Sequence, residues 1–139
     1  MAKPDHYLPV MPYIIVNGAE EFVTFIKAVF DAKEYLKVPH PDGTLMHAEF
    51  GIGEGTIMFT QSRDVYPPFP CGMFVVQDDV DATYARGLAN GAESMQEPND
   101  AEYGRAAGFK DSWGNVWWLN NPAGWKSFTT ESQGLGIES

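Results

Sequence analysis

The chain has 139 residues, of which 44% are hydrophobic and 14% aromatic, enough for one compact core or two small fused modules. Its formal net charge is −10 and its nine basic residues are scattered, which argues against a nucleic-acid partner. No apolar run approaches the ~20 residues of a membrane span, so no membrane partner is expected. The N-terminus resembles no secretory signal and Cys71 is the single cysteine, so the expected location is cytoplasmic.

The first half of the chain reads as a strand, a helix and three further strands. Val10 to Val16 ends in a β-branched run that predicts a strand. Asn17 and Glu20 form a variant of the capping box, which predicts a helix over 19–30 whose apolar residues recur at helical spacing. Three short strands are expected next, at 33–38, 45–52 and 56–60. A tight turn at 53–54 connects the last two.

The second half repeats this order after a proline-rich linker. Pro67, Pro68 and Pro70 cannot donate to a sheet ladder, so residues 63–70 are expected to be a linker. The pattern then predicts a strand at 73–76, a helix capped by Asp78-Asp79 and ending at 90–91, and strands at 94–97, 105–111 and 116–119.

These patterns predict an α+β fold of two βαβββ modules that form a cupped mixed β-sheet with helices on the outside. The expected boundaries are 1–62 for the first module, 63–70 for the linker, 71–120 for the second module and 121–139 for a tail that is loosely ordered or ordered only against a partner subunit.

Three strings resemble the vicinal oxygen chelate superfamily, which includes glyoxalase I, bleomycin-resistance proteins, fosfomycin-resistance enzymes and extradiol dioxygenases. They are the first strand and helix from Val16 to Phe30, the segment Gly43–Phe50 with its His-Ala-Glu, and the ending Tyr103–Trp118. The second and third strings are similar to the PhnB-like branch. The resemblance spans roughly residues 9–120 and implies a small-molecule cleft and this superfamily's fold.

The metal-dependent members of this superfamily carry His or Glu at four strand positions. The matched strings place these positions on Met11, Met58, Gly72 and Trp118. None of the four offers an imidazole nitrogen or a carboxylate oxygen, the donors that suit a divalent metal. The resemblance therefore implies a cleft without the usual metal site, and no cofactor is expected.

The strand pattern brings two candidate catalytic residues to the cleft. If Gly53-Glu54 is a two-residue turn, Glu49 pairs with Met58 and His47 pairs with Thr60. His47 and Glu49 would then be a plausible acid–base pair, with Met58 and Thr60 as ligand contacts. The alternative is a hydrogen-bonded histidine on the sheet surface, and for Glu49 the structural role is favoured, because a shift of one residue in register would turn both outward.

Three further residues are candidate ligand contacts. Arg105 could bind a carboxylate or phosphate, although a surface ion pair is the favoured alternative. Trp118, at a vacant ligand position, would present an aromatic wall to the cleft, with Trp113 near it, while Trp117 would pack against the second helix. His6 and His40 are expected to be solvated.

Three hypotheses for function follow. The leading one is a metal-independent protein that binds a small organic molecule in a cleft of a homodimer. The second is a lyase or isomerase that uses His47 and Glu49, with or without a displaced metal. The third is a structural or interaction module whose cleft is filled by its own tryptophans. A roomy apolar pocket beside Met58 and Trp118 would favour the first.

Overall fold

The computed structural model describes residues 2–123, so most of the tail expected at 121–139 lies outside the described residues. Two helices and eight strands follow each other in the expected order. The first module comprises β1 (Tyr13–Val16), α1 (Ala19–Phe30), β2 (Lys33–Pro39), β3 (Leu45–Ile52) and β4 (Gly55–Gln61). The second comprises β5 (Gly72–Val76), α2 (Val80–Ala89), β6 (Glu93–Ala101), β7 (Gly104–Lys110) and β8 (Val116–Asn121).

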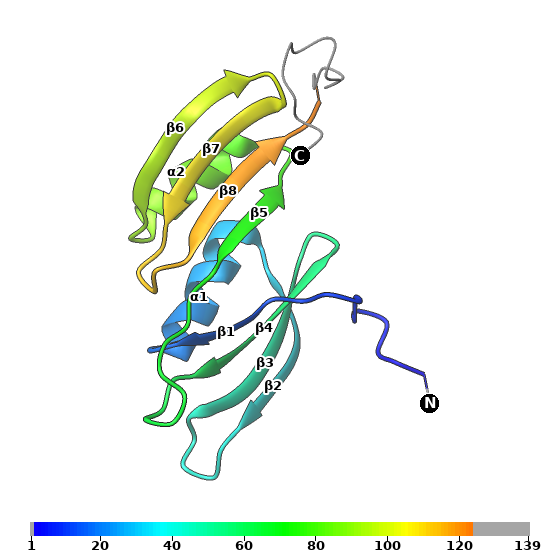
Figure 1. The fold of residues 1–139 in the computed structure, drawn as a ribbon, viewed down its shortest axis with the longest axis vertical. Coiled ribbons are helices and arrows are strands. Elements are labelled where there is room, and N and C mark those ends of the chain that lie inside the picture. The colour runs from blue at the N-terminus through cyan, green and yellow to red at the C-terminus, as the bar shows by residue number, and fades with distance from the viewer. Residues whose placement is uncertain (1, 124–139) are drawn as a thin grey trace, which may run out of the picture.

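Each module forms its own four-stranded mixed sheet. The strand orders are β1-β4-β3-β2 and β5-β8-β7-β6, with the first strand of each module parallel to the last and all other pairs antiparallel. The predicted α+β fold of two βαβββ modules is therefore confirmed. Figure 1 shows the two sheets one beyond the other along the long axis, with α1 at their junction. Neither described helix is long and apolar enough to cross a membrane.

The register of the β3–β4 hairpin follows the predicted two-residue turn. Ile52 pairs with Gly55, and Glu49 pairs with Met58. Gly53 has a positive φ of 56°, a conformation that suits glycine in a tight hairpin turn. Because side chains alternate along a strand, this register decides which residues share a face with His47.

The cap of α1 differs from the prediction. Helix α1 has its predicted bounds, but its N-cap is Gly18, with φ at 102°, and no capping bond comes from Asn17. Instead the side-chain oxygen of Gln61, at the end of β4, accepts hydrogen bonds from the backbone N–H groups of Gly18 and Ala19 at 3.1 and 2.8 Å. Capping by a distant strand satisfies the same free donors, and no local sequence motif signals it.

Helix α1 packs against both modules. Phe22 of α1 meets Phe59 of β4 edge-to-face, with ring centroids 4.8 Å apart. From the same helix Phe30 lies 4.5 Å from the Trp117 ring of β8. Trp117 was expected to pack against the second helix; its strand β8 contacts α2, and the ring of Phe30 from α1 also lies against Trp117. One hydrophobic core therefore runs through both modules.

Two segments depart from their predicted bounds. Strand β6 was expected at 94–97 but spans Glu93–Ala101, with register shifts along its pairing with β7 that account for the weak alternation in its sequence. The linker lacks a regular ladder, as its prolines predict, but Phe69 forms an isolated antiparallel bridge with Ile15 of β1.

Candidate functional site

The face of the first sheet opposite α1 carries four of the predicted site residues. Ala48 and Phe50 alternate toward α1, where Phe50 stacks on Phe59. His47 and Glu49 therefore project from the other face, which we call the open face of the first sheet. Met58 pairs with Glu49, and Thr60 lies two residues further along β4, so both share this face. The hydroxyl of Thr60 donates to the backbone oxygen of Met46 at 2.7 Å.

Glu49 is the centre of a hydrogen-bond cluster on this face. Its side chain is only 2% exposed, yet it has three partners. His47 Nε2 lies 2.8 Å from Oε2, His6 Nε2 lies 2.7 Å from Oε1, and the Tyr7 hydroxyl donates to Oε2 at 2.6 Å. The expectation that His6 is solvated is wrong, because the segment before β1 folds back onto the sheet and buries most of its ring.

Burial and hydrogen bonding act in opposite directions on Glu49. Burial raises the pKa of its carboxyl, but hydrogen bonds from His6, Tyr7 and His47 outweigh burial and lower the pKa to about 2. The carboxylate is therefore ionised at neutral pH and can only accept hydrogen bonds. Three of its roughly four acceptor sites are already occupied, so Glu49 is suited to orient the imidazole of His47 and poorly suited to take up a proton itself.

The second nitrogen of His47 faces Tyr13 of β1. The Tyr13 hydroxyl lies 3.3 Å from His47 Nδ1, and the two rings stack with centroids 5.6 Å apart. Burial, and more weakly the proximity of Tyr66, raise the pKa of the Tyr13 hydroxyl, so it stays protonated at neutral pH. A carboxylate, an imidazole and a hydroxyl thus lie in series, which is the arrangement that activates a proton-transfer group in many sites.

The N-terminal segment covers part of the open face of the first sheet. The ring of His6 stacks on Tyr35 of β2 at 4.2 Å, and the Thr56 hydroxyl of β4 donates to the His6 backbone oxygen. Thr56 and Met58 are consequently buried. Sequence reasoning missed His6, Tyr7 and Tyr35, because no periodicity or capping pattern precedes β1 to show where that segment lies.

Trp118 lies on the equivalent open face of the second sheet. It pairs with Gly108 of β7, where an added Cβ would meet the indole at 2.6 Å, so the indole lies directly over this glycine. Its other neighbour in register is Phe74 of β5, and the two side chains are 38% and 61% exposed. Trp118 and His47 belong to separate sheets of the chain.

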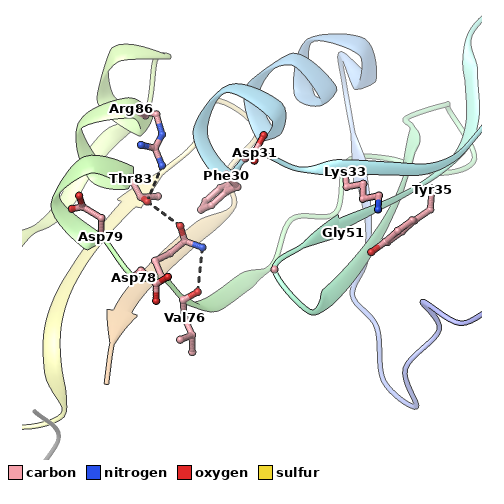
Figure 2. A pocket seen from close by; sticks show the side chains of 12 residues that line it. Phe30, Asp31, Lys33, Tyr35, Gly51, Val76, Asp78, Asp79, Thr83 and Arg86 are labelled. Atoms are coloured by element: carbon pink, nitrogen blue, oxygen red, sulfur yellow. Dashed lines mark hydrogen bonds between the residues drawn. The ribbon is translucent and has the colours of Figure 1, made fainter. Parts of the chain in front are cut away.

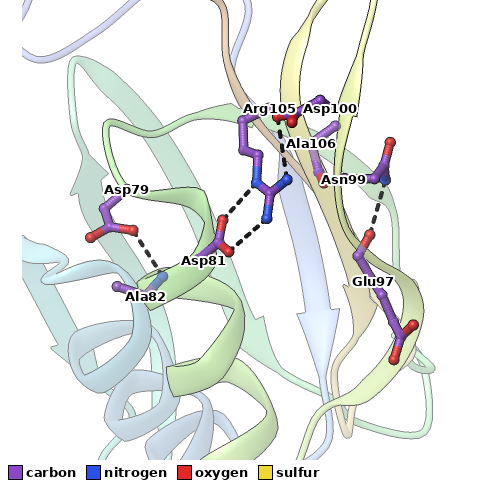
Figure 3. A network of polar contacts seen from close by, with 8 residues as sticks. All are labelled: Asp79, Asp81, Ala82, Glu97, Asn99, Asp100, Arg105 and Ala106. Carbon is purple, nitrogen blue, oxygen red and sulfur yellow. Dashed lines mark hydrogen bonds and ion pairs between the residues drawn. The ribbon is translucent and has the colours of Figure 1, made fainter.

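Arg105 and Trp113 lie elsewhere. Arg105 forms two hydrogen bonds of 2.9 and 2.8 Å with the Asp81 carboxylate of α2, and a third of 3.3 Å with Asp100 (Figure 3). This is the surface ion pair that was the favoured alternative. Trp113 packs edge-on against Phe22 of α1, and its indole N–H donates to the Asn17 backbone oxygen at 3.0 Å, which joins the two modules.

Two pockets lie between the modules. The polar one, of about 500 Å³, is bordered by the end of α1 and the start of α2, and its charged side chains include Lys33, Asp79 and Arg86 (Figure 2). The apolar one, of about 870 Å³, lies between the N-terminal segment, the β3–β4 turn and β5, and includes Val10 and Phe74. The predicted site residues line neither pocket directly, but the apolar pocket reaches Phe74, the neighbour of Trp118.

The residues at the four vacant positions do not fit the superfamily's metal. Met11 and Met58 present thioethers, Trp118 presents an indole, and Gly72 has no side chain. Among residues 2–123, no group of three or more His, Cys, Asp and Glu side chains is arranged to hold a metal ion. In the cluster around Glu49, the nitrogens of His6 and His47 bond to different oxygens of the carboxylate.

Comparison with known proteins gives a family match over most of the chain. The model of the glyoxalase/bleomycin resistance protein/dioxygenase superfamily matches residues 3–119. An uncharacterised protein of Mycobacterium tuberculosis (strain H37Rv) is 30% identical over 123 residues, which cover 80% of this chain and 72% of that protein.

Solved structures share the fold. TioX from Micromonospora sp. ML1 matches with a TM-score of 0.68 and 23% identity, covering 88% of this chain and all of TioX. TnmS3, an antibiotic binding protein from Streptomyces sp. CB03234, matches with a TM-score of 0.61 and 23% identity, covering 84% of this chain and 99% of the TnmS3 chain. The PhnB protein from Bacillus cereus matches with a TM-score of 0.63 and 14% identity, covering 82% of this chain and 99% of the PhnB chain. At these identities the likeness concerns the fold alone.

Proposed function

Because the chain belongs to the glyoxalase/bleomycin resistance protein/dioxygenase superfamily, we propose that it binds a small organic molecule in a cleft over its sheets, without the usual metal. In this proposal a homodimer completes the cleft, and the protein acts in the cytoplasm. The resemblance of the Gly43–Phe50 string supports membership of the PhnB-like branch. Drug-binding members of this fold supply the analogy, since TnmS3 is described as an antibiotic binding protein.

The apolar pocket beside β5 is the observation that carries this proposal. Its volume of about 870 Å³ lies within the usual range for small-molecule sites, and Val10, Met73 and Phe74 are among its apolar lining residues. Phe74 continues this lining to Trp118, so an aromatic surface extends from the pocket over the open face of the second sheet. Such a surface suits a partly aromatic or amphipathic ligand.

The homodimer is supported by the same surface. Phe74, Val76 and Trp118 are exposed on one face of the second sheet, and within one chain nothing among the described residues covers them. The open face of the first sheet carries Met58 and His47, the counterparts expected across the cleft. A second copy that places its first sheet opposite this surface would enclose a ligand between the two.

The experiment is a thermal-shift screen with a panel of aromatic and peptide antibiotics, followed by titration of tryptophan fluorescence with each hit. Trp118→Ala is expected to weaken binding by about 1–3 kcal/mol, because it removes an aromatic wall. Val65→Ala, at an exposed linker position, is the control and should bind as the wild type does. Equal affinity in the Trp118 variant and the control would contradict the proposed cleft.

A lyase or isomerase remains the second candidate, and one observation favours it. His47 Nε2 lies 2.8 Å from Glu49, which is the contact an acid–base pair requires. The three donors around Glu49 shift the proton-accepting role to His47, with Glu49 orienting it. The third hypothesis, a cleft filled by the chain's own tryptophans, fits Trp117, which is fully buried, but not Trp118, which is 38% exposed.

A further inference from the structure

Three polar side chains on the open face of the first sheet are connected in series by close contacts. The series runs from the buried carboxylate of Glu49 through His47 to the hydroxyl of Tyr13. The two contacts are 2.8 Å, from Glu49 Oε2 to His47 Nε2, and 3.3 Å, from His47 Nδ1 to the Tyr13 oxygen. The series begins in the protein interior and ends at a phenol that is 47% exposed.

The partners of His47 decide which of its nitrogens carries a proton. Ionised Glu49 offers no hydrogen, so the nitrogen that faces it, Nε2, must be the N–H donor. In a neutral imidazole Nδ1 is then bare and accepts a hydrogen bond from the Tyr13 hydroxyl. A proton that reaches Nδ1 would create an imidazolium 2.8 Å from the Glu49 carboxylate, which stabilises the added charge.

Tyr13 is placed to connect this imidazole to a bound molecule. Its hydroxyl keeps its own proton at neutral pH, because burial and Tyr66 raise its pKa. A hydroxyl of this kind donates one hydrogen bond, here to His47, and still has lone pairs free to accept another from a ligand.

We propose that Glu49, His47 and Tyr13 form a proton relay that recognises a phenolic or enolic hydroxyl of the ligand and binds it as the oxyanion. The ligand O–H passes its proton to the Tyr13 oxygen while Tyr13 passes its own proton to His47 Nδ1. The products are the ligand oxyanion, a neutral Tyr13 and an imidazolium beside Glu49, so no proton is gained or lost. This inference rests on the proposed small-molecule function and narrows its ligand class.

Other titratable groups near the relay contact Glu49, at its buried end, or lie near Tyr13, at its exposed end. His6 and Tyr7, from the N-terminal segment, bond to Glu49, and Tyr35 of β2 stacks on His6. Tyr66, which follows β4, raises the pKa of the Tyr13 hydroxyl. Strand β4 contributes Met58 and Thr60 to this face, and neither titrates. Glu49 is therefore the charge that decides whether His47 accepts a proton.

The test uses 4-nitrophenol, whose phenolate absorbs visible light and whose phenol form does not. The full-length protein is titrated with the probe at fixed pH, and the phenolate fraction of the bound probe is read by difference absorbance. The wild type is expected to raise the phenolate-to-phenol ratio about tenfold over free probe, since the imidazolium formed nearby favours the anion. Tyr13→Phe and His47→Gln should each abolish this increase.

Tyr103→Phe is the matched control, because it removes one phenol hydroxyl from an exposed position in the second module and should retain the increase. A bound probe with an unshifted ratio in the wild type would overturn the relay, and so would an increase that survives Tyr13→Phe. Failure of 4-nitrophenol to bind would overturn the assigned ligand class, while the antibiotic screen would still decide the proposed function independently. Circular dichroism of each variant shows whether it folds.

Discussion

At the scale of single residues, the hydrogen bonds that stabilise the buried Glu49 carboxylate also make it a poor proton acceptor. Its pKa of about 2 reflects three hydrogen-bond donors that outweigh the cost of burial. The sequence placed His47 and Glu49 on one face correctly, because strand alternation and a two-residue turn determine the register. It could not reveal the positions of His6 and Tyr7, since these residues lie in a segment without a periodic pattern. Their hydrogen bonds to Glu49 change its expected role from acid–base catalyst to a group that orients His47.

The low pKa of Glu49 predicts a specific dependence of stability on pH. A carboxyl whose pKa is lower in the folded than in the unfolded chain stabilises the fold above its unfolded value. This stabilisation is lost as pH falls from about 4.5 toward 2. The contribution is on the order of 3 kcal/mol. Urea unfolding at pH 6 and pH 3 should therefore show a much smaller difference for Glu49→Gln than for the wild type.

Glu54→Gln serves as the control for this measurement, because Glu54 lies exposed in the β3–β4 turn, whereas Glu49 is buried. It should retain the pH dependence of the wild type. An equal loss of pH dependence in both variants would show that the acid sensitivity does not originate at Glu49.

At the scale of elements, the sequence predicted bounds well where apolar periodicity is strong. Helix α1 was placed at its observed ends because Phe22, Phe25, Ile26 and Val29 repeat at helical spacing. Strand β6 was underestimated because its pairing is irregular. The α1 cap was misassigned to Asn17 because the group that provides it, Gln61, is supplied by tertiary structure.

The cap assignment can be tested by substitution. Gln61→Ala removes the acceptor of both the Gly18 and the Ala19 N–H groups, so it should lower the free energy of unfolding by about 1 kcal/mol. Asn17→Ala removes only an accepted bond from the Gln61 side chain and should cost less. Chemical denaturation of both variants decides the matter, since a larger loss in Asn17→Ala would restore Asn17 as the cap.

A second element-scale prediction concerns the contact of α2 with its sheet. A Cβ added at Gly87 would lie 2.4 Å from the ring of Phe109, too close for the ring to remain in place. Gly87→Ala should therefore destabilise the protein by about 1–3 kcal/mol, although alanine is the better helix former. In a Phe109→Leu background the same substitution should cost less. An equal cost in both backgrounds, measured by thermal unfolding, would show that the ring is not the obstacle.

At the scale of the whole molecule, the two modules are joined through α1 rather than through a shared sheet. Phe30 and Trp117 connect them, and the strands of the two modules form two separate sheets. The sequence predicted both modules but could not give their mutual placement, because strand and helix patterns carry no information about it. Met58 and Trp118, both predicted to line the cleft, lie on separate sheets, and in the proposed homodimer a second copy brings the two surfaces together.

The homodimer is accordingly the next prediction. Light scattering should give twice the 15.4 kDa mass of the chain, because the exposed surface of Phe74, Val76 and Trp118 is covered by the second copy. Phe74→Asp should shift the mass toward the monomer by placing a charge in this apolar contact. Val65→Asp, which adds the same charge at an exposed linker position, should remain dimeric. A wild-type monomer would contradict the shared cleft.

The most direct test of the central claim is native mass spectrometry of freshly purified protein, with elemental analysis of the same sample. We expect a dimer that retains a small organic molecule and carries no stoichiometric divalent metal, since Met58, Gly72 and Trp118 offer no suitable donors. One tightly held zinc, nickel or manganese ion per chain, in a protein that retains no organic molecule, would contradict this expectation, because functional metal sites bind that firmly.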